Sequence, residues 1–93
     1  MRRIDPTRQF KRDYMREAKG KHRTTLDAAL MPIVGLLAND VAPAKSRRDH
    51  ALTGSLSDHR DCHLKPDLIL IYRKPDDDTL QLVRLGSHSE LGL

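Results

Sequence analysis

One uninterrupted apolar run constrains the fold of this chain more than any other segment: Leu68-Ile69-Leu70-Ile71-Tyr72. A strand with one solvent-exposed face alternates apolar and polar residues, whereas both faces of this run are apolar. The run therefore predicts a central strand, over residues 67–73, that is covered on both sides. Residues 60–64 and 79–85 are also strand-like, and Pro75-Asp76-Asp77-Asp78 predicts a turn before the last strand.

The first half of the chain has helical spacing instead. After a short strand over residues 2–4, Pro6 and Thr7 suit the first turn of a helix, and Gly20 suits its end. The apolar stripe of this helix consists of Phe10, Tyr14 and Ala18.

A second helix is expected from Thr24 or Thr25 to Asn39-Asp40. Its buried face consists of Leu26, Ala29, Leu30, Ile33, Val34 and Leu37. Pro32 removes a backbone donor and clashes one turn back, which predicts a kink or a break into two short helices. The order β-α-α-β-β-β then favours an α+β fold, with two helices packed on an antiparallel sheet.

The size and composition suit a single domain over residues 1–93. Cys62 is the only cysteine, so an intrachain disulfide is excluded and a reducing compartment fits. The longest apolar stretch, residues 28–38, is too short to cross a bilayer, and the first five residues lack the apolar segment of a signal peptide. We therefore expect a cytoplasmic protein without a membrane partner.

The charge is unevenly distributed. Residues 1–48 carry 12 Lys and Arg against 5 Asp and Glu, a net charge of +7, whereas residues 49–93 have a net charge of −3. The basic half suits a polyanion such as RNA, although solvated helices with basic outer faces give the same pattern. The candidate contacts to RNA or the ribosome are Arg12, Arg16, Lys19, Lys21, Arg47 and Arg48.

Strand geometry is expected to gather several polar side chains. A short hairpin turn over residues 64–66 would place His63 directly across from Asp67. The next hairpin would place Arg84 opposite the start of the central strand, within a residue of Asp67. His88 follows after a turn at Gly86, and His50 precedes the strands and can reach the same place.

Such a set of side chains suits RNA cleavage without a metal ion. The RNA supplies its own nucleophile, the 2′-OH, so the protein must remove one proton, donate another to the leaving 5′-oxygen and stabilise the phosphate. Histidine, with a reference pKa of about 6.5, does either proton transfer near neutrality, and arginine forks onto phosphate oxygens. The candidate catalytic residues are His50, His63, Asp67, Arg84 and His88.

Several of these polar residues also have simpler interpretations. We interpret His22 as a surface residue and His59 as a strand residue that faces solvent, while Cys62 alternates into the core. For Asp67 the simpler interpretations are a turn cap and a pairing with Arg84.

A metal site is the main rival to this chemistry. On a strand, His59 and His63 lie about 13 Å apart and cannot share one ion. The chain contains no Cys-x-x-Cys or His-Glu-x-x-His motif. We therefore predict no metal ligands and no cofactor.

At these residues the chain resembles a known family, the YafQ branch of the RelE/ParE superfamily of type II toxins. Three segments carry the resemblance. They are Arg48-Asp49-His50-Ala51-Leu52-Thr53-Gly54, then Arg60-Asp61-Cys62-His63-Leu64-Lys65-Pro66-Asp67 with Leu70-Ile71-Tyr72, and finally Arg84-Leu85-Gly86-Ser87-His88.

The resemblance implies a RelE-like fold with helices on a twisted antiparallel sheet. It implies an endoribonuclease that cleaves mRNA in the ribosomal A site, leaving a 2′,3′-cyclic phosphate and a 5′-OH. It also implies a cognate antitoxin, DinJ-like and of the ribbon-helix-helix type, with operator DNA bound only through the toxin–antitoxin complex. Carried over by motif, the active-site positions are His50, His63, Asp67, Arg84 and His88. Our hypothesis for their roles is that His88 is the general acid, that Arg84 holds the phosphate, and that His50, His63 or Asp67 serves as, or orients, the general base.

Departures from the family pattern leave the codon preference open. Ser57 and His59 stand where a bulkier or aromatic pattern is expected, and Leu91-Gly92-Leu93 lacks an aromatic residue that can stack on a base. Two alternatives remain: a non-catalytic, ParE-like toxin that binds DNA gyrase, and a basic RNA-binding module. The histidines argue against the gyrase binder, which has no need of acid–base residues.

Overall fold

Strand β4 (Leu68–Arg73) lies at the centre of a five-stranded sheet with the strand order β1-β5-β4-β3-β2. All five residues of its apolar run are buried, which confirms the predicted central strand. This computed structural model describes residues 1–93, except for the side chain of Ser55. Strands β3 (Arg60–Lys65) and β5 (Thr79–Gly86) flank β4 in antiparallel orientation, and β2 (His50–Ala51) extends the sheet beyond β3.

The first strand corrects the expectation of a wholly antiparallel sheet. Strand β1 (Arg3–Pro6) runs parallel to β5, with Arg3 beside Thr79 and Pro6 beside Leu82, so the sheet is mixed. Parallel neighbours need a long connection, and here the helices and the other strands separate β1 from β5 along the chain. Proline lacks a backbone donor, which suits the edge position of Pro6.

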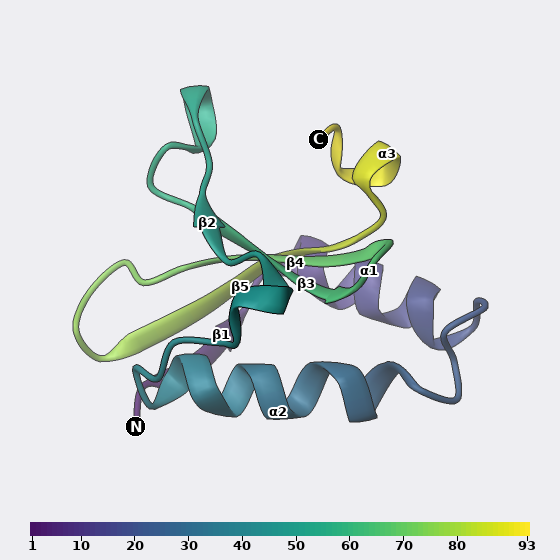
Figure 1. The fold of residues 1–93 in the computed structure, drawn as a ribbon, viewed down its shortest axis with the longest axis horizontal. Helices are drawn as coiled ribbons and strands as arrows, with labels where there is room; N and C mark the ends of the chain where they lie inside the picture. The colour runs from purple at the N-terminus through teal and green to yellow at the C-terminus, as the bar shows by residue number, and fades with distance from the viewer.

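Helices α1 (Arg8–Ala18) and α2 (Leu26–Ala38) pack on one side of the sheet (Figure 1). Thr7 caps α1 as predicted, because its Oγ1 accepts a hydrogen bond from the backbone N–H of Phe10 at 3.0 Å. The helices and the sheet share one apolar core, whose strand members are Cys62, Leu64, Leu68, Leu70, Tyr72, Leu80, Leu82 and Leu85. Burial of these side chains is the main force that holds the two layers together.

Helix α2 runs through Pro32 without the expected break into two helices. Proline at this position removes the hydrogen bond to the carbonyl of Ala28, one turn back. Ala28 and Pro32 are both exposed, so the unpaired carbonyl lies on the solvent side of the helix. The apolar side of α2 packs on the sheet and holds the helix in one piece. No helix in the described part of the chain has the length and apolar character to span a bilayer.

The face of the sheet opposite the helices is bordered by two raised segments (Figure 1). On one side the chain leaves β2 and forms a 3-10 turn, η2 (Gly54–Leu56); on the other it leaves β5 and forms the short helix α3 (His88–Leu91). Between them lie Ile69 and Ile71, the residues of β4 that alternate away from the core. This bordered face is called the open face below.

Candidate active site

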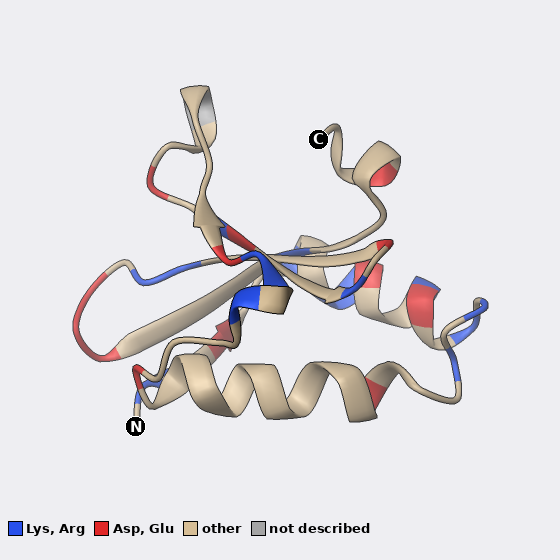
Figure 2. Cartoon of the chain, viewed as in Figure 1, with Lys and Arg blue, Asp and Glu red and all other residues tan. Residues whose placement is uncertain are grey.

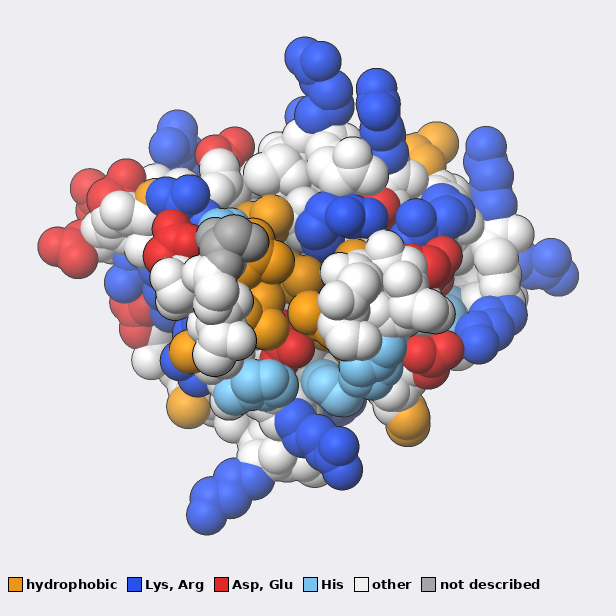
Figure 3. Space-filling model, turned by 90° about the horizontal axis from the view of Figure 1, so that it is seen from above, with side chains coloured by type: hydrophobic (Ala, Val, Ile, Leu, Met, Phe, Trp, Pro, Cys, Tyr) orange, Lys and Arg blue, Asp and Glu red, His pale blue; other side chains and the backbone are white. Residues whose placement is uncertain are grey.

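Three histidines surround a buried carboxylate on the open face. His50, His63 and His88 form this histidine cluster, and the charge of Asp61 acts on all three imidazoles. Histidine side chains gather beside acidic groups on this side of the molecule in Figure 3. The structure therefore brings together the three histidines that the sequence singled out, and adds a carboxylate that it did not.

Strand alternation explains how these side chains reach one face. Cys62 and Leu64 point into the core, so Asp61 and His63 point to the open face. His50 pairs directly with Asp61 across β2 and β3, which places its ring on the same face. The signal for Asp61 was present in the sequence, because it lies two residues before His63 in a strand.

Two oxygens lie against Nδ1 of His50. The backbone carbonyl of Arg48 is 2.8 Å away and Oδ1 of Asp61 is 3.0 Å away. Arg48 adopts a positive φ of 52°, which turns the chain from the 3-10 helix η1 (Lys45–Arg47) into β2. Because a carbonyl only accepts hydrogen bonds, Nδ1 of His50 carries a hydrogen, and Nε2 of the neutral ring is left with a free lone pair.

Asp61 is a buried carboxylate whose Oδ1 lacks a hydrogen-bond donor among the described residues. Its residue is 4% exposed, and Oδ1 accepts no hydrogen bond of good geometry from any described residue, so its attraction to His50 is electrostatic. Burial raises the pKa of Asp61 above its usual value, even though the nearby histidines favour the charged form. A carboxylate in this state responds to any change of charge on the imidazoles around it.

His63 and His88 lie edge to face. Their ring centroids are 5.2 Å apart and the rings are inclined at 71°. Burial is the largest cause that lowers the pKa of His63, and the positive charges of His88 and Arg48 act in the same direction. His63 is therefore neutral near pH 7, in the form that accepts a proton.

Asp67 reaches the cluster by a different route from the one expected. The predicted pairing of His63 with Asp67 is wrong, because His63 lies opposite Ile69 and a register shift separates it from Lys65. The turn is tight, with only two residues between β3 and β4, so Asp67 lies at its exposed tip. From there its Oδ1 lies 3.7 Å from Nδ1 of His88, and Oδ2 lies 3.8 Å from Nζ of Lys21.

The expected position of Arg84 is also corrected by the register. Arg84 lies opposite Ile71 rather than at the start of β4, because the hairpin pairs Arg73 with Gln81 instead of Thr79 and the register shifts by one more residue between Leu82 and Arg84. Asp61 also lies opposite Ile71 from the other side. His50, Asp61, Ile71 and Arg84 thus form one row across the sheet.

A second carboxylate, missed in the sequence, holds Arg84. Asp13 of α1 is 1% exposed, and its Oδ2 accepts hydrogen bonds from Nε of Arg84 at 2.7 Å and from the backbone N–H of Leu85 at 3.0 Å. Burial acts to raise the pKa of Asp13, but these donors outweigh it and hold the pKa below its usual value. Its signal was an acidic residue immediately before Tyr14, beside the apolar stripe of the first helix.

The histidine cluster and Arg84 lie on opposite sides of β4. Strands β3 and β5 are separated only by β4, so His63 and Arg84 arise from strands about 10 Å apart. The side chains of Ile69 and Ile71 lie between them and are 0% and 1% exposed, so neighbouring groups cover them. Imidazoles on one side and a guanidinium on the other therefore border the same face of the sheet.

The predicted RNA-binding residues fall into three groups. Arg12 and Lys19 are exposed on and after α1, and Lys21 lies near Asp67; Figure 2 shows basic positions along α1 and in the turn after it. Arg47 and Arg48 both line a cavity of about 430 Å³ beside His63 and His88, and Arg47 also donates to the carbonyl of Leu64 at 2.7 Å.

Arg16 contacts more protein groups than the other candidates, although its side chain is 42% exposed. Its guanidinium donates to the carbonyl of Leu85 at 2.9 Å and lies 3.3 Å from carboxylate oxygens of both Asp13 and Glu90. The structure therefore places Arg16 at the edge of β5, where it contacts protein groups.

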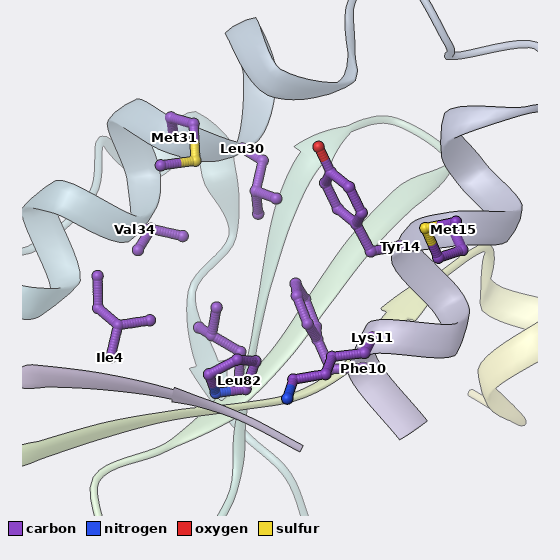
Figure 4. Close-up of a pocket in the computed structure, with 10 residues that line it drawn as sticks. Ile4, Phe10, Lys11, Tyr14, Met15, Leu30, Met31, Val34 and Leu82 are labelled. Atoms are coloured by element: carbon purple, nitrogen blue, oxygen red, sulfur yellow. The ribbon is translucent and has the colours of Figure 1, made fainter. Parts of the chain in front are cut away.

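The larger cavity lies on the other side of the molecule and holds none of the predicted catalytic residues. It has a volume of about 470 Å³ and is lined mostly by apolar side chains of β1, α1 and α2 (Figure 4). Tyr14 and Lys11 are the titratable residues of this groove. None of the clustered histidines reaches this groove, so the candidate active site is the smaller, polar cavity beside the cluster.

The remaining histidines lie outside the cluster. His59 precedes β3 instead of lying in a strand, and its side chain is 12% exposed and 2.7 Å from Oδ1 of Asp58, so the solvent-facing interpretation is wrong. His22 is half-buried, and its Nδ1 lies 3.3 Å from Nζ of Lys65. Cys62 is fully buried in the core, as predicted. No group of three or more potential metal ligands occurs among the described residues.

Comparison with known proteins identifies the family. The profile of the family described as a bacterial toxin of type II toxin-antitoxin system, YafQ, matches residues 2–92. The mRNA interferase toxin YafQ of Escherichia coli K12 is 35% identical over 89 residues, which cover 95% of this chain and 92% of the relative. The crystal structure of YafQ from E. coli BL21(DE3) covers 98% of both chains, with 33% identity and a TM-score of 0.83.

Two further structures are similar over the same length. YafQ in the E. coli DinJ–YafQ complex has 33% identity, a TM-score of 0.83 and 98% coverage of both chains. A metal-bound toxin from Helicobacter pylori has 41% identity and a TM-score of 0.78, and the match covers 98% of this chain and 99% of that toxin. With a family match over nearly its whole length and relatives above 30% identity, this chain belongs to the YafQ family of toxins of bacterial type II toxin-antitoxin systems.

Proposed function

We propose that this chain is an endoribonuclease toxin that cleaves mRNA in the ribosomal A site and so inhibits translation. The observation that carries the proposal is the placement of His50, His63 and His88 around Asp61, on the same face of the sheet as Arg84 and on the other side of β4. The similar protein of E. coli K12 is named an mRNA interferase toxin, which supports the same reaction class.

The reaction begins with removal of the 2′-OH proton. We assign the general base to the pair His50 and His63. His50 has its Nδ1 hydrogen directed at a backbone carbonyl, which leaves Nε2 to accept a proton, and burial keeps His63 neutral. Asp61 stabilises the imidazolium that forms when either ring takes the proton.

The 2′-oxygen then attacks the adjacent phosphorus, and the bond from phosphorus to the 5′-oxygen breaks. His88 donates a proton to the leaving 5′-oxygen, so the products are a 2′,3′-cyclic phosphate and a 5′-OH, with no net change in protons. Asp67 orients the His88 ring from 3.7 Å away. Because each acid or base contributes about 10²- to 10⁴-fold, loss of one histidine is expected to have a large effect.

Arg84 stabilises the phosphate. Its Nε and Nη2 face Asp13, while Nη1 has no partner among the described side chains and backbone groups. A planar guanidinium held on one side by a buried carboxylate presents its other side in a fixed orientation. Charge that is already in place when the phosphorane forms lowers the barrier without reorganisation.

The partners follow from the same proposal. We infer a cognate antitoxin of the DinJ-like, ribbon-helix-helix type, because similar YafQ chains form DinJ–YafQ complexes. Contact with operator DNA would then pass through the antitoxin, and the toxin would act in the cytoplasm, where ribosomes and mRNA are found. We assign contact with ribosomal RNA to the exposed basic residues Arg12, Lys19, Lys21 and Arg48.

The test is cleavage of an mRNA bound to purified ribosomes, followed by mapping of the 5′ ends. We expect cuts within the A-site codon, a 2′,3′-cyclic phosphate at the new end, and no cleavage when the A site is occupied. His88→Ala should slow cleavage by about 10²-fold or more, and His59→Gln, outside the cluster, should cleave like the wild type. Inhibition of DNA gyrase without any cut RNA would contradict the proposal.

A further inference from the structure

His88 lies on a segment that has little stability of its own. Helix α3 (His88–Leu91) has four residues, and an isolated helix of this length is far below the length that is stable in water. The ring of His88 is nevertheless placed edge to face against His63. Contacts elsewhere must therefore hold α3 against the sheet.

Glu90 forms capping hydrogen bonds with Ser87 and an ion pair with Arg16. Its Oε1 accepts a hydrogen bond from the backbone N–H of Ser87 at 2.9 Å, while Oγ of Ser87 accepts one from the backbone N–H of Glu90 at 3.2 Å. This reciprocal capping box fixes the first turn of α3, which begins at His88. The other carboxylate oxygen, Oε2, lies 3.3 Å from Nε of Arg16 in α1.

Arg16 extends this contact to the sheet. Its Nη2 donates to the carbonyl of Leu85 at 2.9 Å, at the end of β5 from which the chain leaves for α3. The approach is close: a Cβ on Gly86 would lie 2.9 Å from Nη2 of Arg16 and 3.1 Å from Oε1 of Glu90. One guanidinium thus joins α1, the end of β5 and α3.

We propose that Glu90, together with Arg16, is a positioning residue for His88. The two side chains form a latch that holds α3 against α1 and β5 and so keeps the His88 imidazole beside His63. Both side chains are about 40% exposed, so the ion pair by itself contributes little to global stability. Its effect is on geometry, because a displacement of about 1 Å at an acid–base group costs up to about 10²-fold in rate.

The latch rests on the proposed function, in which His88 protonates the leaving 5′-oxygen. The test is single-turnover cleavage of ribosome-bound mRNA by Glu90→Ala, with His88→Ala measured in parallel. We expect Glu90→Ala to be slower by about 10- to 100-fold, with unchanged ribosome affinity. Glu17→Gln is the matched control, because Glu17 is also an ion-pair partner of Arg16 (3.0 Å) and belongs to α1 rather than α3; it should cleave like the wild type.

A second substrate separates positioning of the acid from a general structural defect. In this mRNA, sulfur replaces the bridging 5′-oxygen at the scissile phosphate, and the phosphorus–sulfur bond breaks to release a thiolate that needs no proton. We expect both Glu90→Ala and His88→Ala to cleave it at close to the wild-type rate. Glu90→Gln retains the capping hydrogen bond but loses the charge, so its cleavage rate on ordinary mRNA should fall by less than that of Glu90→Ala. Its rate on the sulfur substrate should also be close to that of the wild type. This variant provides the test if Glu90→Ala does not fold.

Two results would overturn the latch alone: a wild-type rate for Glu90→Ala on ordinary mRNA while His88→Ala is slow, or a loss in the folded variant that the sulfur substrate does not recover. A wild-type rate for His88→Ala on ordinary mRNA would instead overturn the proposed role of His88, and the latch with it.

Discussion

Nδ1 of His50 lies 3.0 Å from Oδ1 of Asp61, directly across the two strands β2 and β3. The histidine is exposed and the carboxylate is buried, so one partner faces solvent while the other is shielded. Shielded charges interact more strongly than exposed ones, because little water lies between them. This relationship makes Asp61 the electrostatic centre of the cluster.

Asp61→Asn is expected to slow cleavage by about 10-fold, because it leaves the imidazolium without a stabilising charge. The charge of Asp61 also acts to raise the pKa of His63, so its loss lowers that pKa further. Since the base must be neutral, the acidic limb of the profile of cleavage rate against pH should move to lower pH. Measurement of single-turnover rates between pH 5 and 8 checks this, and an unshifted limb would exclude His63 as a base under the control of Asp61.

The same substitution should change how stability depends on pH. The pKa of Asp61 is raised in the folded protein, so its ionisation favours the unfolded state. The wild type therefore loses stability as the pH rises from the ordinary carboxyl pKa of 3.8 through the raised value, and Asp61→Asn does not. The difference in Tm, variant minus wild type, should be larger at pH 7 than at pH 3; a constant difference would contradict the raised pKa.

Asp13→Asn is expected to destabilise the protein by about 3 kcal/mol at pH 7, because it leaves Arg84 without its buried partner. The pKa of Asp13 is lowered in the folded state, so its contribution is present above 3.8 and disappears as the pH falls below that value. Urea unfolding at pH 7 and at pH 3 measures both effects. Asp77→Asn, at an exposed turn, is the control and should be neutral.

Pro32→Ala is expected to stabilise the protein by about 1–2 kcal/mol, because alanine restores the hydrogen bond to the Ala28 carbonyl and favours the helix, less the entropy that proline removes from the unfolded chain. Thermal unfolding should show a rise in Tm of several degrees, since 1 kcal/mol corresponds to about 4–8 °C in a chain of this size. Cleavage should be unchanged. A fall in Tm would show that proline is required at this point of α2.

Two glycine substitutions are expected to have opposite effects. Gly86→Ala places a methyl group against Arg16 and Glu90, so it should displace α3 and lower the cleavage rate. Gly35→Ala lies inside α2, where the new Cβ has no atom within 4 Å apart from its chain neighbours and the local helix backbone; the substitution should raise stability by about 1 kcal/mol without affecting cleavage. The pair is compared by Tm and by single-turnover rate.

Much of the fold could be predicted because its signals are local. The apolar run of β4, the cap at Thr7 and the acidic turn before β5 depend on neighbouring residues, and all three were found in the expected places. The direction of β1 was not predictable in this way, because its partner lies more than 70 residues away in the chain.

The candidate site, like the fold, could be predicted from the sequence only in part. The sequence by itself determined which chemical groups this protein has available: three histidines, an arginine and an aspartate in segments that the family motifs mark. Only the tertiary structure decided that His63 pairs with Ile69 rather than with Asp67, and that Asp61 is the carboxylate beside the histidines. It also decided that Asp13 and Arg16 form hydrogen bonds with the backbone of Leu85 in β5. The physical reason is that side-chain identity is set by the chain alone, whereas register, burial and the pKa values that follow from them depend on which distant segments pack together.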